Sequence, residues 1–543
     1  MVSARTSVPA PSNEPVRSYR PGSPEKASLK RRLEELSGET IDAPCVIAGR
    51  EVDTGGTFDV RAPHDHDLHL ATVHAAGEDQ VKSAIEAALQ AKHDWEAMDF
   101  ADRAAIFLKV ADLLSGSWRD TLNAATMLGQ SKTVFQSEID AACELIDFIR
   151  FNVAFAAEIL AAQPNDAPGM WNRLDYRPLE GFVLAMTPFN FTAIAGNLPT
   201  APALMGNTVV WKPSEKQAFS AHYLMQLFAA AGLPDGVINL LHGDGALVSD
   251  VCFEHPEFAG LHFTGSAAVL ETLFGKIGTN VGRYRSFPRI VGESGGKDFL
   301  LMHPSADPDP VATALVRGGF EYQGQKCSAV SRAYLPASGW PELRDHLVDT
   351  TSGLQMGDVT DFRNFMGAVI EGRAFEKHRA AIEEAREDPD VEVLVGGGTD
   401  DSVGWFVEPT ILVTSDPRSR TMVEELFGPI VTVFVYEDSA WESTLELIDT
   451  SSPYALTGGV FADDRAVMVQ ATERLRHAAG NFYLNDKPTG SVVSQQPFGG
   501  ARKSGTNDKA GSKLNLLRWT SPRALKETFE PPRDHRYPHM DEE

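Results

Sequence analysis

The chain has 543 residues, 43% of them hydrophobic, and a net charge of −26. This length predicts two or three domains of roughly 150 residues each, and the hydrophobic content excludes a disordered or fibrous protein. The negative charge repels phosphate backbones, so nucleic acid is not an expected partner. These features are typical of an enzyme that acts on a small molecule.

Cysteine usage and hydropathy bear on the compartment. The four cysteines contain no C-x-x-C pair and are too few for a disulfide framework, so we expect a reducing environment in which one of them can be a free reactive thiol. No apolar stretch reaches the ~18 residues that span a bilayer, so no membrane partner is expected. We expect a cytoplasmic protein. The alternative is a mitochondrial matrix protein, because targeting segments are rich in arginine and the N-terminus contains Arg5, Arg17 and Arg20.

The first part of the chain predicts an arm followed by helices. Residues 1–25 are rich in proline, serine and charge, which is typical of a mobile arm. Apolar residues then recur with helical spacing, and they predict three helices at 78–98, 101–114 and 137–160.

From residue 181 the pattern changes to short apolar runs that alternate with helices. Strands are predicted at 181–188, 207–214, 237–245 and 260–266, with a helix at 220–234. This rhythm indicates a parallel, doubly wound sheet, whose ligands lie beyond the carboxyl ends of the strands. A second alternating region from about residue 312 predicts another α/β domain. The segments 171–180 and 516–529 look like strands that pair away from the main body.

Short motifs follow many of the predicted strands and helices. In chain order they are TPFNF at 187–191, KPSE at 212–215, FTGS at 263–266, VGESGGK at 291–297, GQKCS at 324–328, EELFGP at 424–429 and PFGG at 497–500. Each motif is weak alone. Together and in this order they closely resemble the aldehyde dehydrogenase superfamily, from about residue 45 to about residue 530.

The resemblance implies an α/β fold with a Rossmann-type cofactor domain, an α/β catalytic domain and a β-flap for oligomerisation. The expected boundaries are an N-terminal arm at 1–44, an NAD-binding domain at 45–300 interrupted by oligomerisation strands at 165–180, a catalytic domain at 301–490, and a return to the cofactor domain with an oligomerisation tail at 491–543. A homo-oligomer, a dimer or a dimer-based assembly, is implied.

Three residues match the catalytic positions of the superfamily. Cys327 is the expected nucleophile, because a thiolate that adds to an aldehyde creates a hydride donor. Asn190 is the expected donor to the oxyanion, together with the backbone N–H of the nucleophile. Glu293 is the expected general base that activates water to hydrolyse the thioester.

NAD is the expected cofactor, although the chain has no G-x-G-x-x-G fingerprint. By resemblance, Lys212 and Glu215 hold the adenine-side ribose, and a carboxylate there repels a 2′-phosphate. Ser266 begins a helix whose N-terminus can hold a diphosphate. The remaining expected cofactor residues are Pro188, Phe189, Ser214, Gly243, Gly245, Glu425 and Phe427.

Longer segments at 189–214, 318–329, 489–511 and 517–527 closely resemble the members of the superfamily that oxidise L-glutamate γ-semialdehyde to L-glutamate in proline degradation. The resemblance implies a substrate site with an α-carboxylate anchor and an aliphatic channel. The anchor consists of Ser328, Gly490 and Ser491. The channel is lined by Phe191, Phe498 and Glu144.

Several alternatives stay open. The nearest alternative function is that of another aldehyde dehydrogenase, such as one that oxidises succinate semialdehyde. A non-catalytic relative would be expected to lack Cys327, Glu293 or Asn190, and a cysteine hydrolase would need a histidine partner for Cys327. The histidines and aspartates of 64–69 could suggest metal ligands, but a solvated turn is favoured and no metal is expected. A proline dehydrogenase is a possible separate partner.

Overall fold

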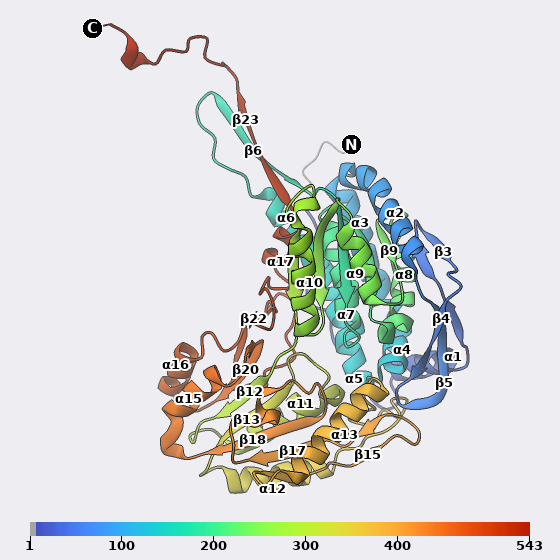
Figure 1. Ribbon diagram of the computed structural model, residues 1–543, viewed down its shortest axis with the longest axis vertical. Helices are drawn as coiled ribbons and strands as arrows, with labels where there is room; N and C mark the ends of the chain where they lie inside the picture. Colours follow the sequence, from blue (N-terminus) through green and yellow to red (C-terminus); the bar gives the residue numbers. More distant parts are fainter. Residues whose placement is uncertain (1–6, 543) are drawn as a thin grey trace.

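Two seven-stranded sheets organise the computed structural model, which describes residues 7–542 (Figure 1). The first sheet runs β11 (Arg289–Glu293), β10 (Phe258–Thr264), β7 (Phe182–Thr187), β8 (Thr208–Pro213), β9 (Ile238–Leu240), β2 (Cys45–Ile47) and β3 (Arg50–Val52). The five strands from β11 to β9 are parallel, and β2 joins β9 in the antiparallel direction. The parallel α/β sheet predicted from the sequence is confirmed.

Helices cover both faces of this sheet, because successive side chains of a strand point to opposite faces. Phe182 and Leu184 pack with α2, α9 and α10, whereas Val183 and Ala185 pack on the other face with α3, α4, α6, α7 and α8. These helices are α2 (Glu78–Ala97), α3 (Phe100–Ser115), α4 (Arg119–Gln130), α6 (Leu145–Ala161), α7 (Thr192–Leu204), α8 (Ala218–Ala231), α9 (Gly245–Glu254) and α10 (Ala267–Asn280).

The second sheet runs β14 (Val391–Val395), β17 (Thr410–Thr414), β18 (Ile430–Tyr436), β13 (Val330–Pro336), β12 (Asp298–Met302), β20 (Thr457–Phe461) and β21 (Asn481–Leu484). Only β14 is antiparallel to its neighbour within this sheet. Leu300 packs with α11 and α12, and Leu301 packs on the other face with α15 and α16. The helices of this half are α11 (Pro308–Phe320), α12 (Trp340–Ser352), α13 (Gly372–Glu387), α14 (Arg420–Val423), α15 (Trp441–Thr450) and α16 (Arg465–Arg474).

Two strands leave the body of the molecule as a ribbon (Figure 1). β6 (Met170–Arg177) pairs along its whole length with β23 (Ser521–Thr528), as the sequence predicts. The smaller sheets are β1 (Ile41–Ala43) with β5 (Asp65–His74) and β4 (Thr57–Ala62), β15 (Thr399–Asp400) with β16 (Phe406–Val407), and β19 (Tyr454–Ala455) with β22 (Ala501–Arg502). The short helix α17 (Lys513–Leu517) precedes β23. None of the helices within residues 7–542 has the length and hydropathy that a membrane span requires.

The helix predicted over 137–160 contains an irregular segment. After α5 (Val134–Ser137), residues Glu138–Glu144 form a π-helix, and α6 continues from Leu145. A π-helical turn changes the direction in which the side chains of a helix point, and such turns are frequent at functional sites. Glu144 stands at the end of this segment.

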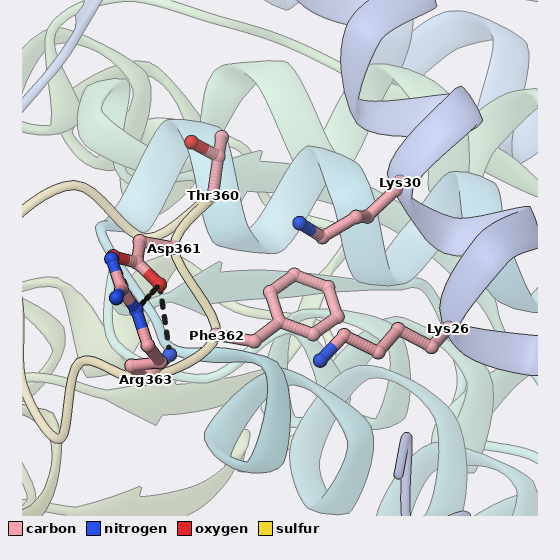
Figure 2. Close-up of a pocket in the computed structure, with 6 residues that line it drawn as sticks. All are labelled: Lys26, Lys30, Thr360, Asp361, Phe362 and Arg363. Carbon is pink, nitrogen blue, oxygen red and sulfur yellow. Dashed lines mark hydrogen bonds and ion pairs between the residues drawn. The ribbon is translucent and has the colours of Figure 1, made fainter. Parts of the chain in front are cut away.

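The prediction of a mobile arm over residues 1–25 is wrong for the described part, 7–25. Tyr19 is buried, and α1 (Pro24–Ser37) begins at residue 24. Lys26 and Lys30 of α1 each place an ammonium group 5.3 Å from the ring centre of Phe362, beside a surface cavity of about 410 Å³ (Figure 2). Tyr19 contacts the same ring edge-on. Cation–π contacts of this kind hold the segment against the second half of the chain.

Candidate active site

The loops that follow four parallel strands of the first sheet carry many of the predicted site residues. β7 ends at Thr187, before Pro188–Phe191, and β8 ends at Pro213, before Ser214 and Glu215. β10 leads to Ser266, and β11 ends at Glu293 itself. Because these strands are parallel, their carboxyl ends share one edge of the sheet, where ligands bind in folds of this class.

Cys327 follows a tight turn, Glu321–Gly324, at the end of α11. Tyr322, Gln323 and Gly324 all have positive φ (53°, 56° and 66°), a conformation that is strained for the two non-glycine residues. The Gln323 amide holds the turn by donating to two backbone carbonyl oxygens, at 3.0 and 2.7 Å. A Cβ at position 324 would lie 2.3 Å from the carbonyl oxygen of Gly428, so glycine is required there.

The surroundings of the Cys327 side chain favour the neutral thiol. Burial raises its pKa well above the usual range, and the carboxylates of Asp298, Glu293, Glu425 and Glu144 raise it further. A thiol must lose its proton before it becomes a nucleophile. The thiol of the resting cysteine must therefore lose its proton before it attacks.

Asn190 lies against the cysteine loop. It is buried, and its Nδ2 donates to the backbone carbonyl oxygen of Gln325 at 3.1 Å. The side-chain amide of Gln325 is itself fixed, because its Oε1 accepts from the backbone N–H of Ile370 at 2.9 Å. An amide nitrogen carries two hydrogens, so the contact with Gln325 leaves the second N–H of Asn190 for another acceptor.

Glu293 projects from the end of β11 toward the PFGG loop. A Cβ at Gly499 would lie 3.0 Å from its Oε1, and its Oε2 has no hydrogen-bond partner among the described residues. Burial raises the pKa of Glu293 to about 8, which the backbone N–H of Gly500 and the charge of Lys509 partly offset and the charge of Asp508 reinforces. A carboxyl group that titrates near neutrality can accept and release protons during turnover.

Lys509 holds the backbone against which Glu293 packs. Its ammonium donates to the carbonyl oxygens of Gly480 at 2.8 Å and Gly499 at 2.9 Å, and to Asn481 Oδ1 at 3.3 Å. Burial lowers the pKa of Lys509, while the charge of Glu293 opposes that shift. Nothing in the sequence around Lys509 predicts this position, because its partners lie on separate parts of the chain.

Lys212 and Gly245 lie side by side at the expected adenine-side ribose site. Lys212 is buried, and a Cβ at Gly245 would lie 3.4 Å from its Nζ. Burial lowers the pKa of Lys212, and the carboxylates of Glu215 and Asp244 oppose this. Glu215 is exposed and lines a cavity of about 340 Å³. The ribose of a cofactor fits this site, because the Lys212 ammonium and the Glu215 carboxylate can bind its free hydroxyl groups and Gly245 leaves space.

Ser266 caps the N-terminus of α10, and its Oγ accepts from the backbone N–H of Val269 at 3.4 Å. The end of this helix is exposed, which suits a diphosphate. Gly243 has φ = 110° and packs against Ala75. Ser214 is fixed by its backbone N–H, which donates to the carbonyl oxygen of Thr187 at 2.9 Å.

The expected nicotinamide residues come together from the two halves of the chain. Phe189 and Phe427 meet edge-to-face, with 5.9 Å between ring centres. Glu425 Oε1 accepts from the backbone N–H of Gly296 at 3.1 Å, and burial raises its pKa to about 7. Glu425 therefore contacts the loop that links Glu293 to β12.

One predicted anchor residue, Ser328, contacts the residue that precedes the other two. Ser328 Oγ lies 2.8 Å from Thr489 Oγ1, and Thr489 directly precedes Gly490. Gly490 has φ = 92°, and Ser491 is partly exposed.

Two of the expected channel residues, Phe191 and Glu144, lie beside a buried charge pair. Lys132 binds Asp140 at 2.7 Å, and its ammonium lies 4.0 Å from the ring centre of Phe191. Burial raises the pKa of Glu144 to about 8, and the charge of Asp140 adds to the shift. Phe498 exchanges two backbone hydrogen bonds with Ala510, at 3.0 and 2.8 Å.

Comparison with known proteins decides the family. A family model described as "Aldehyde dehydrogenase family" matches residues 51–524. The chain belongs to the aldehyde dehydrogenase family. Among curated relatives, the probable delta-1-pyrroline-5-carboxylate dehydrogenase of Schizosaccharomyces pombe is 52% identical over 97% of both chains. The mitochondrial delta-1-pyrroline-5-carboxylate dehydrogenase of Dictyostelium discoideum is 50% identical over 99% of this chain and 97% of its own.

A solved structure agrees closely with this aldehyde dehydrogenase. It is the Delta-pyrroline-5-carboxylate dehydrogenase of Mycobacterium tuberculosis bound with NAD, at 58% identity and a TM-score of 0.96. The match covers 99% of this chain and 100% of the other.

The histidine-rich segment 64–69 of this aldehyde dehydrogenase is not the solvated turn that was expected. His64 is buried, and burial lowers its pKa. The residues from Asp65 onward belong to β5, where strand pairing with β4 orders them.

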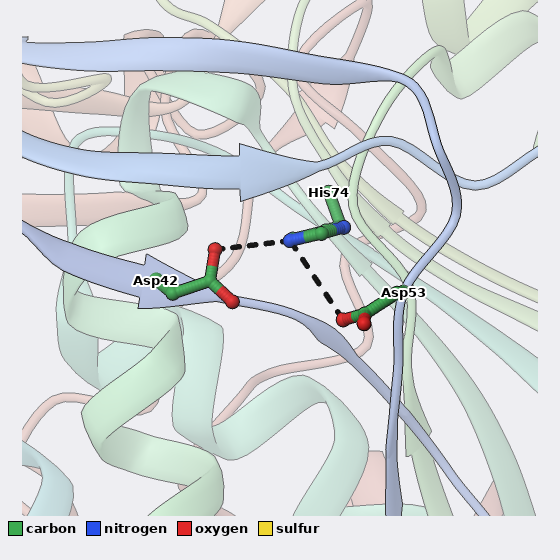
Figure 3. Close-up of side chains that lie close together, drawn as sticks. All are labelled: Asp42, Asp53 and His74. Carbon is green, nitrogen blue, oxygen red and sulfur yellow. Dashed lines mark hydrogen bonds and ion pairs between the residues drawn. The ribbon is translucent and has the colours of Figure 1, made fainter.

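A separate cluster at the other end of β5 is held by a hydrogen bond between His74 and Asp42. His74 Nε2 lies 2.9 Å from Asp42 Oδ1 and 3.9 Å from Asp53 Oδ1 (Figure 3). Both aspartates are exposed. The cluster does not involve the predicted catalytic residues.

Proposed function

We propose that this aldehyde dehydrogenase oxidises L-glutamate γ-semialdehyde, which forms from Δ1-pyrroline-5-carboxylate, to L-glutamate with NAD, in proline degradation. The contact between Ser328 and Thr489 carries the substrate assignment, because it brings the predicted α-carboxylate anchor beside the nucleophile. The names of relatives at 50–58% identity over nearly the whole chain support the same reaction.

The reaction begins at Cys327. As its sulfur attacks the aldehyde carbon, the thiol releases its proton to solvent. The amide of Asn190 and the backbone N–H of Cys327 hold the oxyanion of the thiohemiacetal. When bound, NAD would supply the acceptor for the hydride that leaves the former aldehyde carbon. The product of this step is a thioester on Cys327.

Hydrolysis completes the cycle. Glu293 takes a proton from a water molecule as the water oxygen attacks the thioester carbon. The same donors hold the oxyanion of the new tetrahedral intermediate. The carbon–sulfur bond then breaks, Glu293 returns its proton to the sulfur, Cys327 is restored as the thiol and L-glutamate leaves. Aldehyde, NAD and water are consumed, and carboxylate, NADH and protons are formed.

NAD is preferred over NADP in this proposal. The exposed carboxylate of Glu215 can accept hydrogen bonds from both ribose hydroxyl groups, whereas it repels a 2′-phosphate. Lys212, Gly245, Ser266, Glu425 and the Phe189–Phe427 pair would hold the rest of the cofactor.

The substrate assignment is tested by following NADH formation with glutamate semialdehyde, succinate semialdehyde and propanal. We expect kcat/KM to be highest for glutamate semialdehyde by orders of magnitude, because buried hydrogen-bonding groups reject analogues that leave them unpaired. Higher kcat/KM with another aldehyde would overturn the substrate while leaving the aldehyde chemistry. Well-folded protein that oxidises no aldehyde would overturn both.

Replacing Lys509 by methionine is expected to shift thioester hydrolysis to higher pH. Below a pH of about 8 the Glu293 carboxyl is protonated and cannot act as a base, so hydrolysis accelerates as the pH rises through that value. Loss of the Lys509 charge removes a stabiliser of the carboxylate and raises its pKa further. Rapid-quench measurement of acyl-enzyme decay against pH isolates this step, because Cys327 is acylated and does not titrate.

Lys509→Arg is the matched control, since it keeps the positive charge and should keep the inflection nearer its original pH. An identical pH profile for wild type and Lys509→Met would show that the charge of Lys509 does not affect the pKa of Glu293.

We further infer the domains, assembly and cellular setting. The NAD-binding domain spans 45–300 and the catalytic domain 301–490, with 165–180 and the tail as the oligomerisation elements.

The projecting β6–β23 ribbon supports a homo-oligomer, because strand edges and exposed Trp171 (46% exposed) are suited to a second copy. A proline dehydrogenase is the proposed source of the substrate. The protein acts in the cytoplasm, or in the mitochondrial matrix in a eukaryote, as the name of the Dictyostelium relative suggests.

A further inference from the structure

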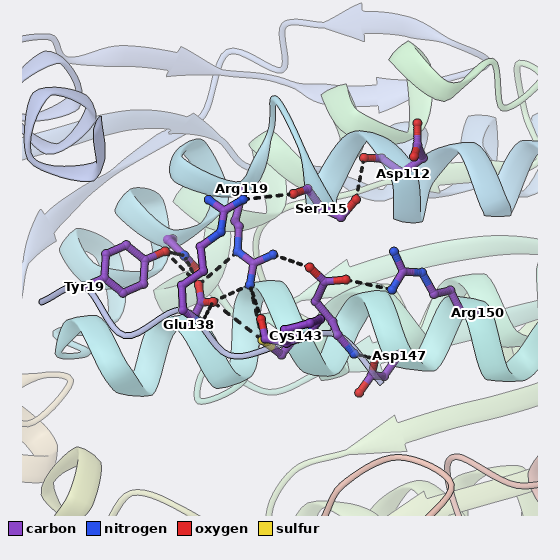
Figure 4. A network of polar contacts seen from close by, with 12 residues as sticks. Tyr19, Asp112, Ser115, Arg119, Glu138, Cys143, Asp147 and Arg150 are labelled. Atoms are coloured by element: carbon purple, nitrogen blue, oxygen red, sulfur yellow. Dashed lines mark hydrogen bonds and ion pairs between the residues drawn. The ribbon is translucent and has the colours of Figure 1, made fainter. Parts of the chain in front are cut away.

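The N-terminal segment, residues 7–23, is fixed by buried charges on α4, the π-helix and α6. The Glu14 carboxylate bridges Arg119 at 2.6 Å and Arg150 at 2.8 Å. Arg119 is buried and also binds Glu138, which accepts the Tyr19 hydroxyl hydrogen bond at 2.8 Å. Figure 4 shows these side chains converging between neighbouring helices. The segment is therefore a fixed part of the helical layer.

Asn13 makes three hydrogen bonds from one side-chain amide. Its Nδ2 donates to Asp147 Oδ2 at 2.8 Å and to the backbone carbonyl oxygen of Val493 at 3.0 Å. Its Oδ1 accepts from Gln495 Nε2 at 3.0 Å. Both N–H groups of the amide are used. Asp147 is held a second time, because its Oδ1 accepts from the backbone N–H of Glu14 at 2.7 Å.

These contacts join two parts of the predicted substrate site. Asp147 stands three residues after Glu144, about one helical turn along the same face. Val493 and Gln495 follow the anchor residues Gly490 and Ser491 within a few positions. Asn13 thus links the helix that carries the channel glutamate to the loop that carries the carboxylate anchor.

The anchor loop, residues 490–496, is held by its own turn and by the contacts of Asn13. It contains no helix or strand, and Gly490 and Ser494 have positive φ. Inside the loop, the backbone N–H of Val492 donates to Gln496 Oε1 at 2.9 Å, and two further backbone N–H groups donate to the carbonyl oxygen of Val492, each at 3.0 Å. Val493 is buried in the main hydrophobic core. Bonds from outside the loop that fix its backbone reduce the freedom lost when a ligand binds.

We propose that Asn13 is a positioning residue for substrate selection: by tying the 490–496 loop to α6, it holds the Gly490 N–H and the Ser491 hydroxyl in the geometry that receives the α-carboxylate of the substrate. This inference rests on the proposed function. Asn13 acts through the loop and does not touch the substrate.

The test compares Asn13→Ala with wild type on glutamate semialdehyde and propanal, which lacks the α-carboxylate. We expect KM for glutamate semialdehyde to rise roughly tenfold, the effect of losing about 1.4 kcal/mol of binding, with kcat little changed. KM for propanal and for NAD should stay at the wild-type values. Ser12→Ala, in the same segment but exposed, is the matched control and should match wild type throughout.

An unchanged KM for glutamate semialdehyde, or equal losses with both aldehydes, would overturn the inference, since equal losses indicate a general structural role. Gln495→Ala keeps the test decisive if Asn13→Ala does not fold, because Gln495 is exposed. It should produce a smaller selective rise in KM, and no selective rise would overturn the inference. Wild type that shows no preference for glutamate semialdehyde would instead overturn the proposed function, so the two failures are distinguishable.

Discussion

Replacing Cys327 by alanine is expected to reduce NADH formation from every aldehyde by a factor on the order of 10⁴ to 10⁶, as loss of a covalent nucleophile does in other enzymes. Without sulfur addition the aldehyde carbon does not become a hydride donor. Steady-state NADH formation measures the loss, and an unchanged thermal unfolding midpoint shows that the variant is folded.

Cys252→Ala is the matched control for this experiment. Cys252 is fully buried in the core, and burial raises the pKa of its thiol. We expect this variant to keep its kcat while losing about 1 kcal/mol of stability through the small cavity that it creates. Full activity of Cys327→Ala would contradict the assignment of Cys327 as the nucleophile. An inactive but folded Cys252→Ala would contradict it as well.

Replacing Glu293 by glutamine is expected to stop the cycle after the first hydride transfer. The amide cannot take a proton from water, so the thioester accumulates and steady-state kcat falls by about 10² to 10⁴. A rapid burst of NADH, close to one equivalent per active site, should precede the slow phase. Stopped-flow absorbance resolves the burst, and mass spectrometry of the quenched protein detects the acyl group on Cys327.

Glu257→Gln serves as the control, because Glu257 is partly exposed and pairs with Arg285 at 3.3 Å. It should turn over like wild type with no burst followed by arrest. If Glu293→Gln instead loses the burst together with turnover, Glu293 is needed to form the thiohemiacetal as well as to hydrolyse the thioester, and the two steps share one base.

The sequence predicts those parts of the molecule whose signals are local. The strand at 181–188 and the helix at 78–98 follow from apolar spacing, and the structure has β7 at Phe182–Thr187 and α2 at Glu78–Ala97. Glu293, at the end of β11, was predicted because the motif around it resembles the superfamily, and it lies at the edge where parallel strands bind their ligands.

The misplaced parts depend on contacts between distant residues. Residues 7–25 have the composition of a mobile arm, but Glu14 and Tyr19 gain order from the buried pair of Arg119 and Glu138. Lys509 lies beside Glu293 only because the chain returns to the first sheet. The polar segment that begins at Asp65 is ordered by pairing with β4, which its composition does not reveal.

The contacts of Asn13 also set an order of events during synthesis. Asn13 and Gln495 are 482 residues apart, so Asn13 leaves the ribosome long before Gln495 has been synthesised. At about 5–20 residues per second, the interval is tens of seconds or more. The helical layer around Arg119 can receive the N-terminal segment early, whereas the 490–496 loop can join it only after residue 496 has been synthesised. Asn13 can therefore bridge the two only after every strand of both seven-stranded sheets has been synthesised.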